Sequence, residues 1–106
     1  MSNWIEIGTL EDIPKLGARV VQHADGNIAV FRTADDKVFA LRDKCPHKGG
    51  QLSQGIVHGD RVACPLHDWK INLATGIAVA PDEGCAASYP VKIDGEMILL
   101  SVTPSE

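Results

Sequence analysis

Four candidate metal ligands lie in two short boxes of the sequence. The first box is Cys45-Pro46-His47 and the second is Cys64-Pro65-Leu66-His67, so each box supplies one cysteine and one histidine. Two thiolates and two imidazoles can hold a mixed-ligand [2Fe–2S] cluster, with both cysteines on one iron and both histidines on the other. The two boxes therefore predict a one-electron transfer centre.

The ligand types also bear on the reduction potential and on the choice of metal. Imidazole carries less negative charge than thiolate, so this cluster repels an added electron less than a four-cysteine cluster does. A structural zinc site is the alternative, because two cysteines and two histidines also complete a tetrahedral Zn²⁺ site. Zinc fingers usually group cysteine with cysteine and histidine with histidine, whereas each box here mixes the two. The spacing therefore favours iron over zinc.

Size and composition indicate one globular domain. The chain has 106 residues, a formal net charge of −4 and no run of Lys or Arg, which argues against a nucleic-acid or anionic-membrane partner. No apolar segment approaches the roughly 20 residues needed to cross a bilayer, and the first residues show no secretory signal. Three cysteines, two of them beside histidines, disfavour a disulfide framework. We expect a single cytoplasmic domain over residues 1–106.

Short apolar runs between frequent turn signals indicate an all-β fold. Strands are expected at residues 4–7, 19–22, 28–32, 38–41, 56–58, 61–63, 71–73, 77–80, 89–93 and 96–102, with a short helical turn at 9–12 capped by Thr9. The dipeptides Asp25-Gly26, Gly59-Asp60 and Asp94-Gly95 mark hairpins. Both boxes then fall on loops at the ends of a small β insertion, where they can face each other.

The predicted cluster-binding subdomain covers about residues 43–70. Gly49-Gly50 permits close approach of backbone N–H groups to the bridging sulfides. Pro46 and Pro65 stiffen the two loops. Leu52, Leu66 and Trp69 are expected to form an apolar cover that limits water around the cluster.

These residues resemble the Rieske [2Fe–2S] domain, over nearly the whole chain. The resemblance is carried by the longer boxes Cys45-Pro46-His47-Lys48-Gly49-Gly50 and Cys64-Pro65-Leu66-His67-Asp68-Trp69. It implies small antiparallel sheets and a Rieske-type cluster held by Cys45, His47, Cys64 and His67. A finer similarity is to the small subunit of assimilatory NAD(P)H-dependent nitrite reductase, through residues 51–59, Trp69, residues 81–85 and residues 89–92.

The finer similarity implies a partner and a pathway. In that family a large subunit carries FAD, a [4Fe–4S] cluster and siroheme, and the complex reduces nitrite to ammonium during nitrate assimilation. This chain is expected to have no catalytic activity alone, since it shows no substrate pocket, nicotinamide fingerprint or acid–base pair. The alternative is a free Rieske ferredoxin that serves an aromatic-ring-hydroxylating dioxygenase. Trp69 and the segment Asp82-Glu83-Gly84-Cys85 favour the nitrite reductase subunit.

Departures from the respiratory Rieske pattern predict a low reduction potential. That pattern has a disulfide between the two loops, and the corresponding positions here are Gly50 and Leu66. Its serine and tyrosine, which donate hydrogen bonds to cluster sulfurs, correspond to Trp69 and Ile71. Fewer donors stabilise the reduced cluster less, so we expect a potential at the low end of the Rieske range of roughly −150 to +300 mV.

The remaining chemical side chains have ordinary interpretations. His23 and His58 lie in hairpin regions without a neighbouring cysteine and are expected to be solvated rather than metal ligands. Cys85 is either a small buried apolar side chain or a thiol at a partner interface. Trp4 is expected in the core.

Overall fold

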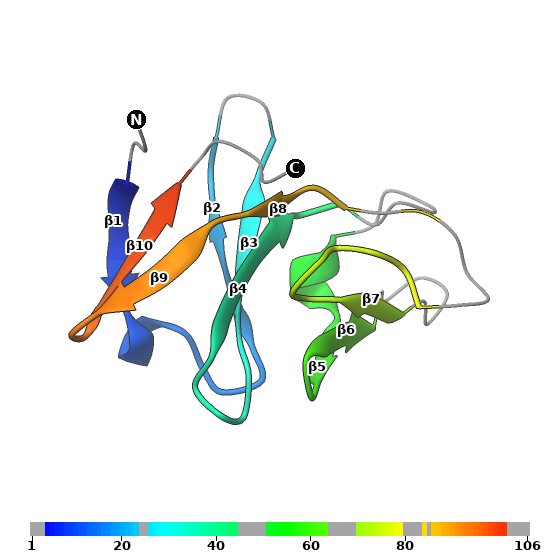
Figure 1. Ribbon diagram of the computed structural model, residues 1–106, viewed down its shortest axis with the longest axis horizontal. Coiled ribbons are helices and arrows are strands. Elements are labelled where there is room, and N and C mark those ends of the chain that lie inside the picture. The colour runs from blue at the N-terminus through cyan, green and yellow to red at the C-terminus, as the bar shows by residue number, and fades with distance from the viewer. Residues whose placement is uncertain are drawn as a thin grey trace.

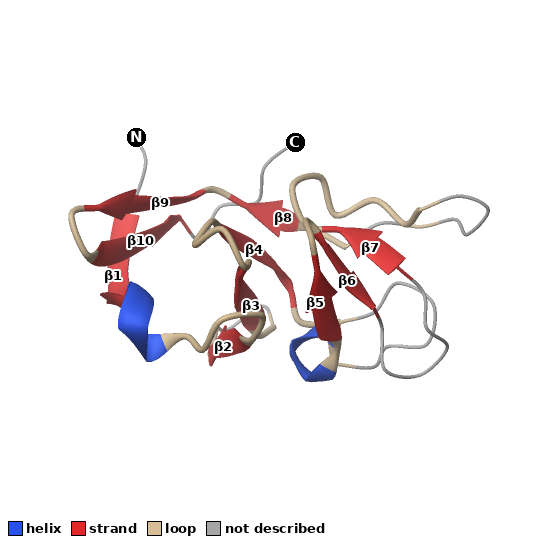
Figure 2. Cartoon of the chain, turned by 90° about the horizontal axis from the view of Figure 1, so that it is seen from below, coloured by secondary structure: helices blue, strands red, loops and turns tan. Residues whose placement is uncertain are grey.

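The structure is a computed structural model that describes residues 4–23, 26–44, 51–63, 70–79, 84 and 86–101. Over these residues the chain forms ten short strands in three antiparallel sheets, with two single-turn 3-10 helices. We name the sheets A (order β1-β10-β9), B (β2-β3-β4-β8) and C (β5-β6-β7). Sheet B lies between the other two in both views (Figure 1, Figure 2). The predicted all-β class is confirmed.

Each sheet is assembled from strands of two to six residues. Sheet A contains β1 (Trp4–Thr9), β9 (Val91–Asp94) and β10 (Met97–Ser101). Sheet B contains β2 (Ala18–Val21), β3 (Ile28–Arg32), β4 (Val38–Arg42) and β8 (Ser88–Tyr89). Sheet C contains β5 (Ile56–His58), β6 (Arg61–Ala63) and β7 (Lys70–Asn72). The helical turns are η1 (Leu10–Asp12) and η2 (Leu52–Gln54).

Strand β3 is buried on both faces and connects the two halves of the core. Side chains alternate across a strand, so Ile28 and Val30 enter one apolar cluster while Ala29 and Phe31 enter the other. The first cluster also contains Ile98 and Leu100 of sheet A, and the second contains Val57, Val62 and Ile71 of sheet C. Sheet C therefore packs on the same central sheet as sheet A, from the opposite side.

The three predicted hairpins are confirmed by the strand register. Val21 pairs with Ile28, His58 with Arg61, and Asp94 with Met97. The turns of the last two hairpins contain Gly59 and Gly95, with φ of +60° and +65°. Glycine adopts this left-handed conformation without the steric cost that a Cβ atom brings.

Four local features differ from the sequence-based expectations. Residues 77–79 of the expected strand 77–80 are not a strand but form an isolated bridge between Ile71 and Ala78, and residue 80 lies outside the described residues. Pro90 divides the expected strand 89–93 into β8 and β9, because proline has no N–H to donate to a ladder. Helix η2 was not expected. Trp4 is only partly buried, and the ammonium of Lys92 lies 4.5 Å from the centre of its ring.

A buried arginine joins η1 to the turn between β3 and β4. The guanidinium of Arg32 donates to the carbonyl oxygens of Leu10 (3.1 Å) and Ile13 (2.8 Å). It also donates twice to one carboxylate oxygen of Asp36, at 3.0 and 2.8 Å. The Arg32 hydrogen bond is the main reason why the pKa of Asp36 lies below its usual value, with Lys15 adding to the effect. These contacts hold η1 against the β3–β4 turn.

Candidate metal centre

The four predicted ligands lie outside the described residues. That holds for Cys45, His47, Cys64 and His67 and for the predicted cover residues Leu66 and Trp69. The described residues define where the two ligand-bearing segments, 45–50 and 64–69, begin and end. Over the described ranges no group of three or more His, Cys, Asp or Glu side chains is placed to hold a metal.

The first ligand-bearing segment is closed at its base by a carboxylate. Asp43 is buried, and its two oxygens accept hydrogen bonds from the backbone N–H of Ser53 (2.7 Å) and from the Ser53 hydroxyl (2.8 Å). The backbone N–H of Asp43 donates to the carbonyl oxygen of Asn27 at 2.8 Å. Asp43 therefore ties the exit from β4 to η2, which is where the chain resumes after the first box.

The second ligand-bearing segment is a hairpin loop. Strands β6 and β7 are antiparallel neighbours, and Ala63 pairs with Lys70. The six residues 64–69 connect these two paired positions. The register of sheet C therefore holds the residues that flank segment 64–69, Ala63 and Lys70, next to each other.

The bases of the two segments meet at one end of sheet C. Ile56, the first residue of β5, pairs with Ala63, the last residue of β6. Just before it, Gly55 passes so close to the Ala63 backbone that a methyl group on Gly55 would overlap the Ala63 carbonyl oxygen. Val79 donates its N–H to Lys70 at 2.8 Å, so residues 80–83 start from the same end. The expectation that the two boxes face each other stays a prediction, because both boxes lie outside the described residues.

An apolar floor lies beneath this end of the sheet. Leu52 and Ile71 are fully buried in the cluster that sheet C shares with sheet B. The position that corresponds to the sulfur-bonding tyrosine of the respiratory pattern therefore carries a buried hydrocarbon side chain, which cannot donate a hydrogen bond. Of the predicted cover, Leu52 is placed in this floor.

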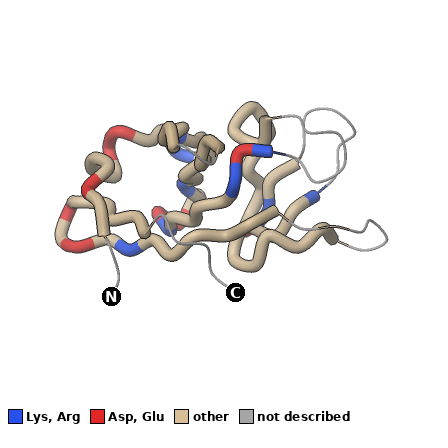
Figure 3. The backbone as a smooth tube through the Cα atoms, turned by 90° about the horizontal axis from the view of Figure 1, so that it is seen from above, with Lys and Arg blue, Asp and Glu red and all other residues tan. Residues whose placement is uncertain are grey.

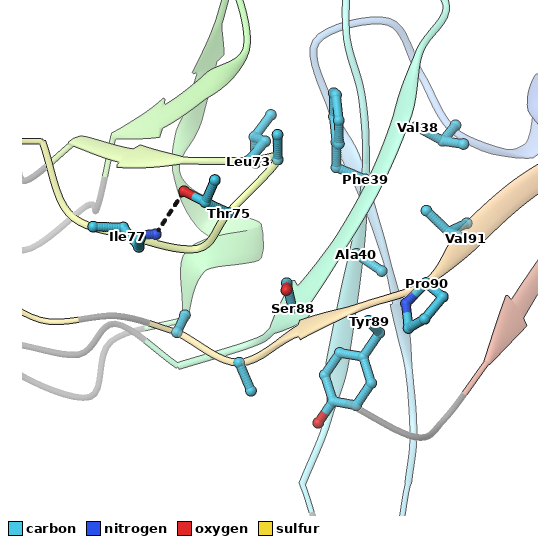
Figure 4. A pocket seen from close by; sticks show the side chains of 13 residues that line it. Val38, Phe39, Ala40, Leu73, Thr75, Ile77, Ser88, Tyr89, Pro90 and Val91 are labelled. Carbon is cyan, nitrogen blue, oxygen red and sulfur yellow. Dashed lines mark hydrogen bonds between the residues drawn. The ribbon is translucent and has the colours of Figure 1, made fainter. Parts of the chain in front are cut away.

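A groove of about 670 Å³ separates the Leu73–Ile77 turn of the sheet C unit from β4, β8 and β9 (Figure 4). Its lining is mainly apolar, and Tyr89 is its titratable side chain. The Tyr89 hydroxyl accepts hydrogen bonds from the Arg42 guanidinium at 2.9 and 2.6 Å. Over the described residues this groove offers no acid–base pair or free nucleophile for catalysis.

The supporting roles of three residues were missed by sequence reasoning. Asp43 carries no motif, Ser53 was noted only within the segment 51–59, and their spacing of ten residues gives no periodic signal. The only available sign was a carboxylate two residues before the first cysteine. Gly55 was likewise not singled out, since a close approach to Ala63 becomes visible only once β5 and β6 are paired.

Comparison with known proteins gives a consistent family. The Rieske [2Fe-2S] domain matches residues 3–90. The ferredoxin component of the naphthalene 1,2-dioxygenase/salicylate 5-hydroxylase systems of Ralstonia sp. is 30% identical over 94% of this chain and 96% of its own length. The ferredoxin of carbazole 1,9a-dioxygenase from Nocardioides aromaticivorans superposes with a TM-score of 0.83 at 25% identity, covering 94% of this chain and 98% of that one.

A second kind of solved structure shares the fold. A chain assigned as an NADH-dependent nitrite reductase small subunit from Mycobacterium tuberculosis superposes with a TM-score of 0.85 at 20% identity. The alignment covers 95% of this chain and 96% of that chain. At this identity the likeness concerns the fold alone.

The donor set fits the cofactor of this family. Two cysteines and two histidines match a Rieske [2Fe–2S] cluster. The second segment begins and ends at paired residues of sheet C, and the first is followed by η2 and β5, whose first residue Ile56 pairs with Ala63. The chain belongs to the Rieske [2Fe-2S] domain family, with a Rieske-type [2Fe–2S] cluster as its cofactor.

Proposed function

We propose that this electron-transfer domain is the small subunit of a cytoplasmic NAD(P)H-dependent nitrite reductase. The observation that carries the proposal is the segment 51–59, Gln51-Leu52-Ser53-Gln54-Gly55-Ile56-Val57-His58-Gly59, whose similarity to that family goes beyond the ligand boxes. In the structure this segment supplies the Asp43 partner Ser53, the floor residue Leu52 and the close approach at Gly55. Residues 81–85 add to the same similarity.

The cluster ligands in this proposal are Cys45 and Cys64 on one iron and His47 and His67 on the other. When bound, the cluster supplies a reversible one-electron centre. The chain itself joins the two ends of the first loop through Asp43 and Ser53, pairs the two ends of the second through Ala63 and Lys70, and excludes water from below with its apolar floor. We assign the cluster-binding subdomain to about residues 43–70.

The partner in this proposal is a large subunit with FAD, a [4Fe–4S] cluster and siroheme, which reduces nitrite to ammonium. In this proposal the small subunit is not catalytic alone. Among the described residues no helix is long and apolar enough to span a membrane.

Copurification with a sirohaem flavoprotein, followed by spectroscopy, tests the proposal. We expect a stable complex with the large subunit, and a Rieske-type visible and EPR spectrum from the small subunit after reduction. His67→Ala should abolish that spectrum, whereas His58→Ala, at an exposed hairpin position, should leave it unchanged. A colourless, EPR-silent protein would point to zinc, and a wild-type spectrum in His67→Ala would refute the ligand assignment.

A second candidate function is a free ferredoxin for a ring-hydroxylating dioxygenase. The relatives favour it, since the dioxygenase ferredoxin from Ralstonia sp. matches along 96% of its length. Reversible reduction of an oxygenase, without a stable complex with a sirohaem flavoprotein, would decide for this candidate.

A redox titration tests the expected low potential in either case. With Ile71 as a buried hydrocarbon, we expect a midpoint near the lower limit of about −150 mV. A clearly positive midpoint would contradict this reasoning and would show that other donors stabilise the reduced cluster.

A further inference from the structure

The outward face of sheet C carries an apolar and basic surface. Val57, Val62, Ile71 and Ala78 point into the core, so their neighbours along the chain point outward. The register places the outward residues in two rows across the sheet: Ile56, Ala63, Lys70 and Val79 in the first row, and His58, Arg61, Asn72 and Ile77 in the second. We call these eight residues the outer face of sheet C.

Two isoleucines of this face are unusually exposed. Ile56 is 73% exposed and Ile77 is 56% exposed. Ile77, Phe39 and Val91 all line the neighbouring groove. In Figure 4 the side chain of Ile77 points away from the other two residues. The two isoleucines lie at opposite edges of the face, Ile56 on β5 and Ile77 beside β7. The basic side chains of Arg61 and Lys70 lie between them, so the face has a basic centre with an exposed apolar residue at each edge.

The ionisable residues of the outer face itself are basic, while two acidic residues, Asp35 and Asp60, line a hollow beside its second row together with His58 and Arg61. The ionisable side chains of the face are Arg61, Lys70 and His58, all exposed, and none of its eight residues is acidic. The whole chain, in contrast, has a net charge of −4. Figure 3 shows that acidic positions of the described chain are concentrated toward sheet A and η1 instead. Nearby Asp60 lies in the β5–β6 turn, where its carboxylate is 3.5 Å from the Lys37 ammonium.

The position of this face beside the cluster loops gives it a role. Ala63 and Lys70 directly flank the segment 64–69, and Val79 starts the segment 80–83. A protein that contacts the first row therefore lies against the base of the second ligand box. The outer face spans four strand positions about 4.8 Å apart and two rows about 7 Å apart. Its area is roughly a quarter of the ~800 Å² that a standard interface buries per partner. The outer face is thus one part of a larger contact.

We propose that the outer face of sheet C docks the large redox subunit through a carboxylate-bearing patch with apolar side chains at its edge. This inference rests on the proposed function, because it takes the occupant to be the sirohaem-bearing subunit. Arg61 and Lys70 pair with the carboxylates and accelerate association, while Ile56 supplies an apolar contact at the edge of the face. The basic sign of the face selects an acidic patch over a basic one.

The test measures the affinity of the cluster-loaded small subunit for the purified large subunit. Ile56→Glu and Arg61→Glu place a negative charge on the outer face. Their matched controls are Ile93→Glu, at a 39% exposed site in sheet A, and Arg19→Glu, at an exposed site in β2. Iron content and melting temperature show that each variant is folded and loaded.

The proposal predicts separate results for the two faces. Each outer-face variant should raise Kd by about tenfold or more, and each control by less than about twofold. Wild-type affinity should fall with added salt, less steeply for Arg61→Glu. Tight wild-type binding with equal Kd values for all four variants would refute docking at this face and leave the proposed function standing. No wild-type binding would refute both.

Discussion

The carboxylate at the base of the first loop makes the sharpest stability prediction. Asp43 accepts two hydrogen bonds from Ser53 at 2.7 and 2.8 Å, and it is only 8% exposed. Hydrogen bonds to a charged group contribute about 1.5–3 kcal/mol each. Asp43→Ala removes both bonds but also removes a buried charge, so we expect a loss of about 2–3 kcal/mol. For a domain of this size that corresponds to a melting temperature lower by roughly 10–20 °C.

Two further variants separate the two bonds. Ser53→Ala removes only the hydroxyl bond and should cost about 1 kcal/mol. Asp43→Asn keeps an oxygen for the Ser53 N–H and offers an amide N–H to the hydroxyl, so it should cost about 1 kcal/mol as well. The expected order of stability is wild type, then these two variants together, then Asp43→Ala.

Urea unfolding of the cluster-loaded protein, followed by circular dichroism, measures these differences. The slope of the free energy of unfolding against urea should stay constant across the series. Iron content and the rate at which the visible absorbance decays report on the loop itself, and we expect both to worsen in the same order. Losses below about 0.5 kcal/mol for both alanine variants would refute the role given to the Asp43–Ser53 pair.

Three further predictions concern parts of the fold away from the ligands. Arg32→Met removes the Arg32 donor from the carbonyls of Leu10 and Ile13, of which Leu10 keeps the Ile13 N–H, and should cost about 2–3 kcal/mol in urea unfolding; an unchanged midpoint would contradict it. The pKa of Asp36 is lower in the folded state than in the unfolded state, so the ionised carboxylate stabilises the fold. This stabilisation is fully present above the unfolded-state pKa of about 3.9 and is lost as pH falls through the lower folded-state pKa. Unfolding measured from pH 6 to pH 2 should therefore show a shallower acid loss in Asp36→Asn than in wild type, and parallel curves would exclude the effect. Gly55→Ala should lower the free energy of unfolding by more than about 2 kcal/mol, because the new methyl group overlaps a backbone oxygen. Gly59→Ala should lower it by about 1 kcal/mol, because its methyl group meets no neighbour and only the left-handed backbone is strained. Equal losses would refute the close approach at Gly55.

Much of the fold could be predicted because its signals are local. Alternating strands and Gly-containing turns report on neighbouring residues, and the predicted hairpins appear with the expected partners. The subdivision at Pro90 was missed, although proline's lack of an N–H was available as a reason. Trp4 was assigned to the core on its size alone. Its place on β1, with Lys92 over the ring, depends on how β9 and β10 lie beside it.

The sequence predicted the ligand types of the candidate centre but not the residues that support its loops. Ligand types and spacing identify a mixed Cys/His centre because coordination chemistry restricts which residues can hold iron. The ligand positions themselves stay a prediction, since they lie outside the described residues. Asp43 and Ser53 could not be found in advance, because their contact depends on how η2 packs beneath β3.

The pairing of β1 with β10 has a consequence for how the protein is made. These strands are about as distant in sequence as the described chain permits, so during synthesis β1 has no hydrogen-bonding partner until β10 leaves the ribosome. Sheet C is a pair of adjacent hairpins, and the core residues it packs against all precede Ala87. We therefore expect the half of the domain that contains sheet C to fold while sheet A still lacks β10. A nascent chain stalled before residue 97 would expose β1 as an unpaired edge, the kind of strand that draws other chains into aggregation.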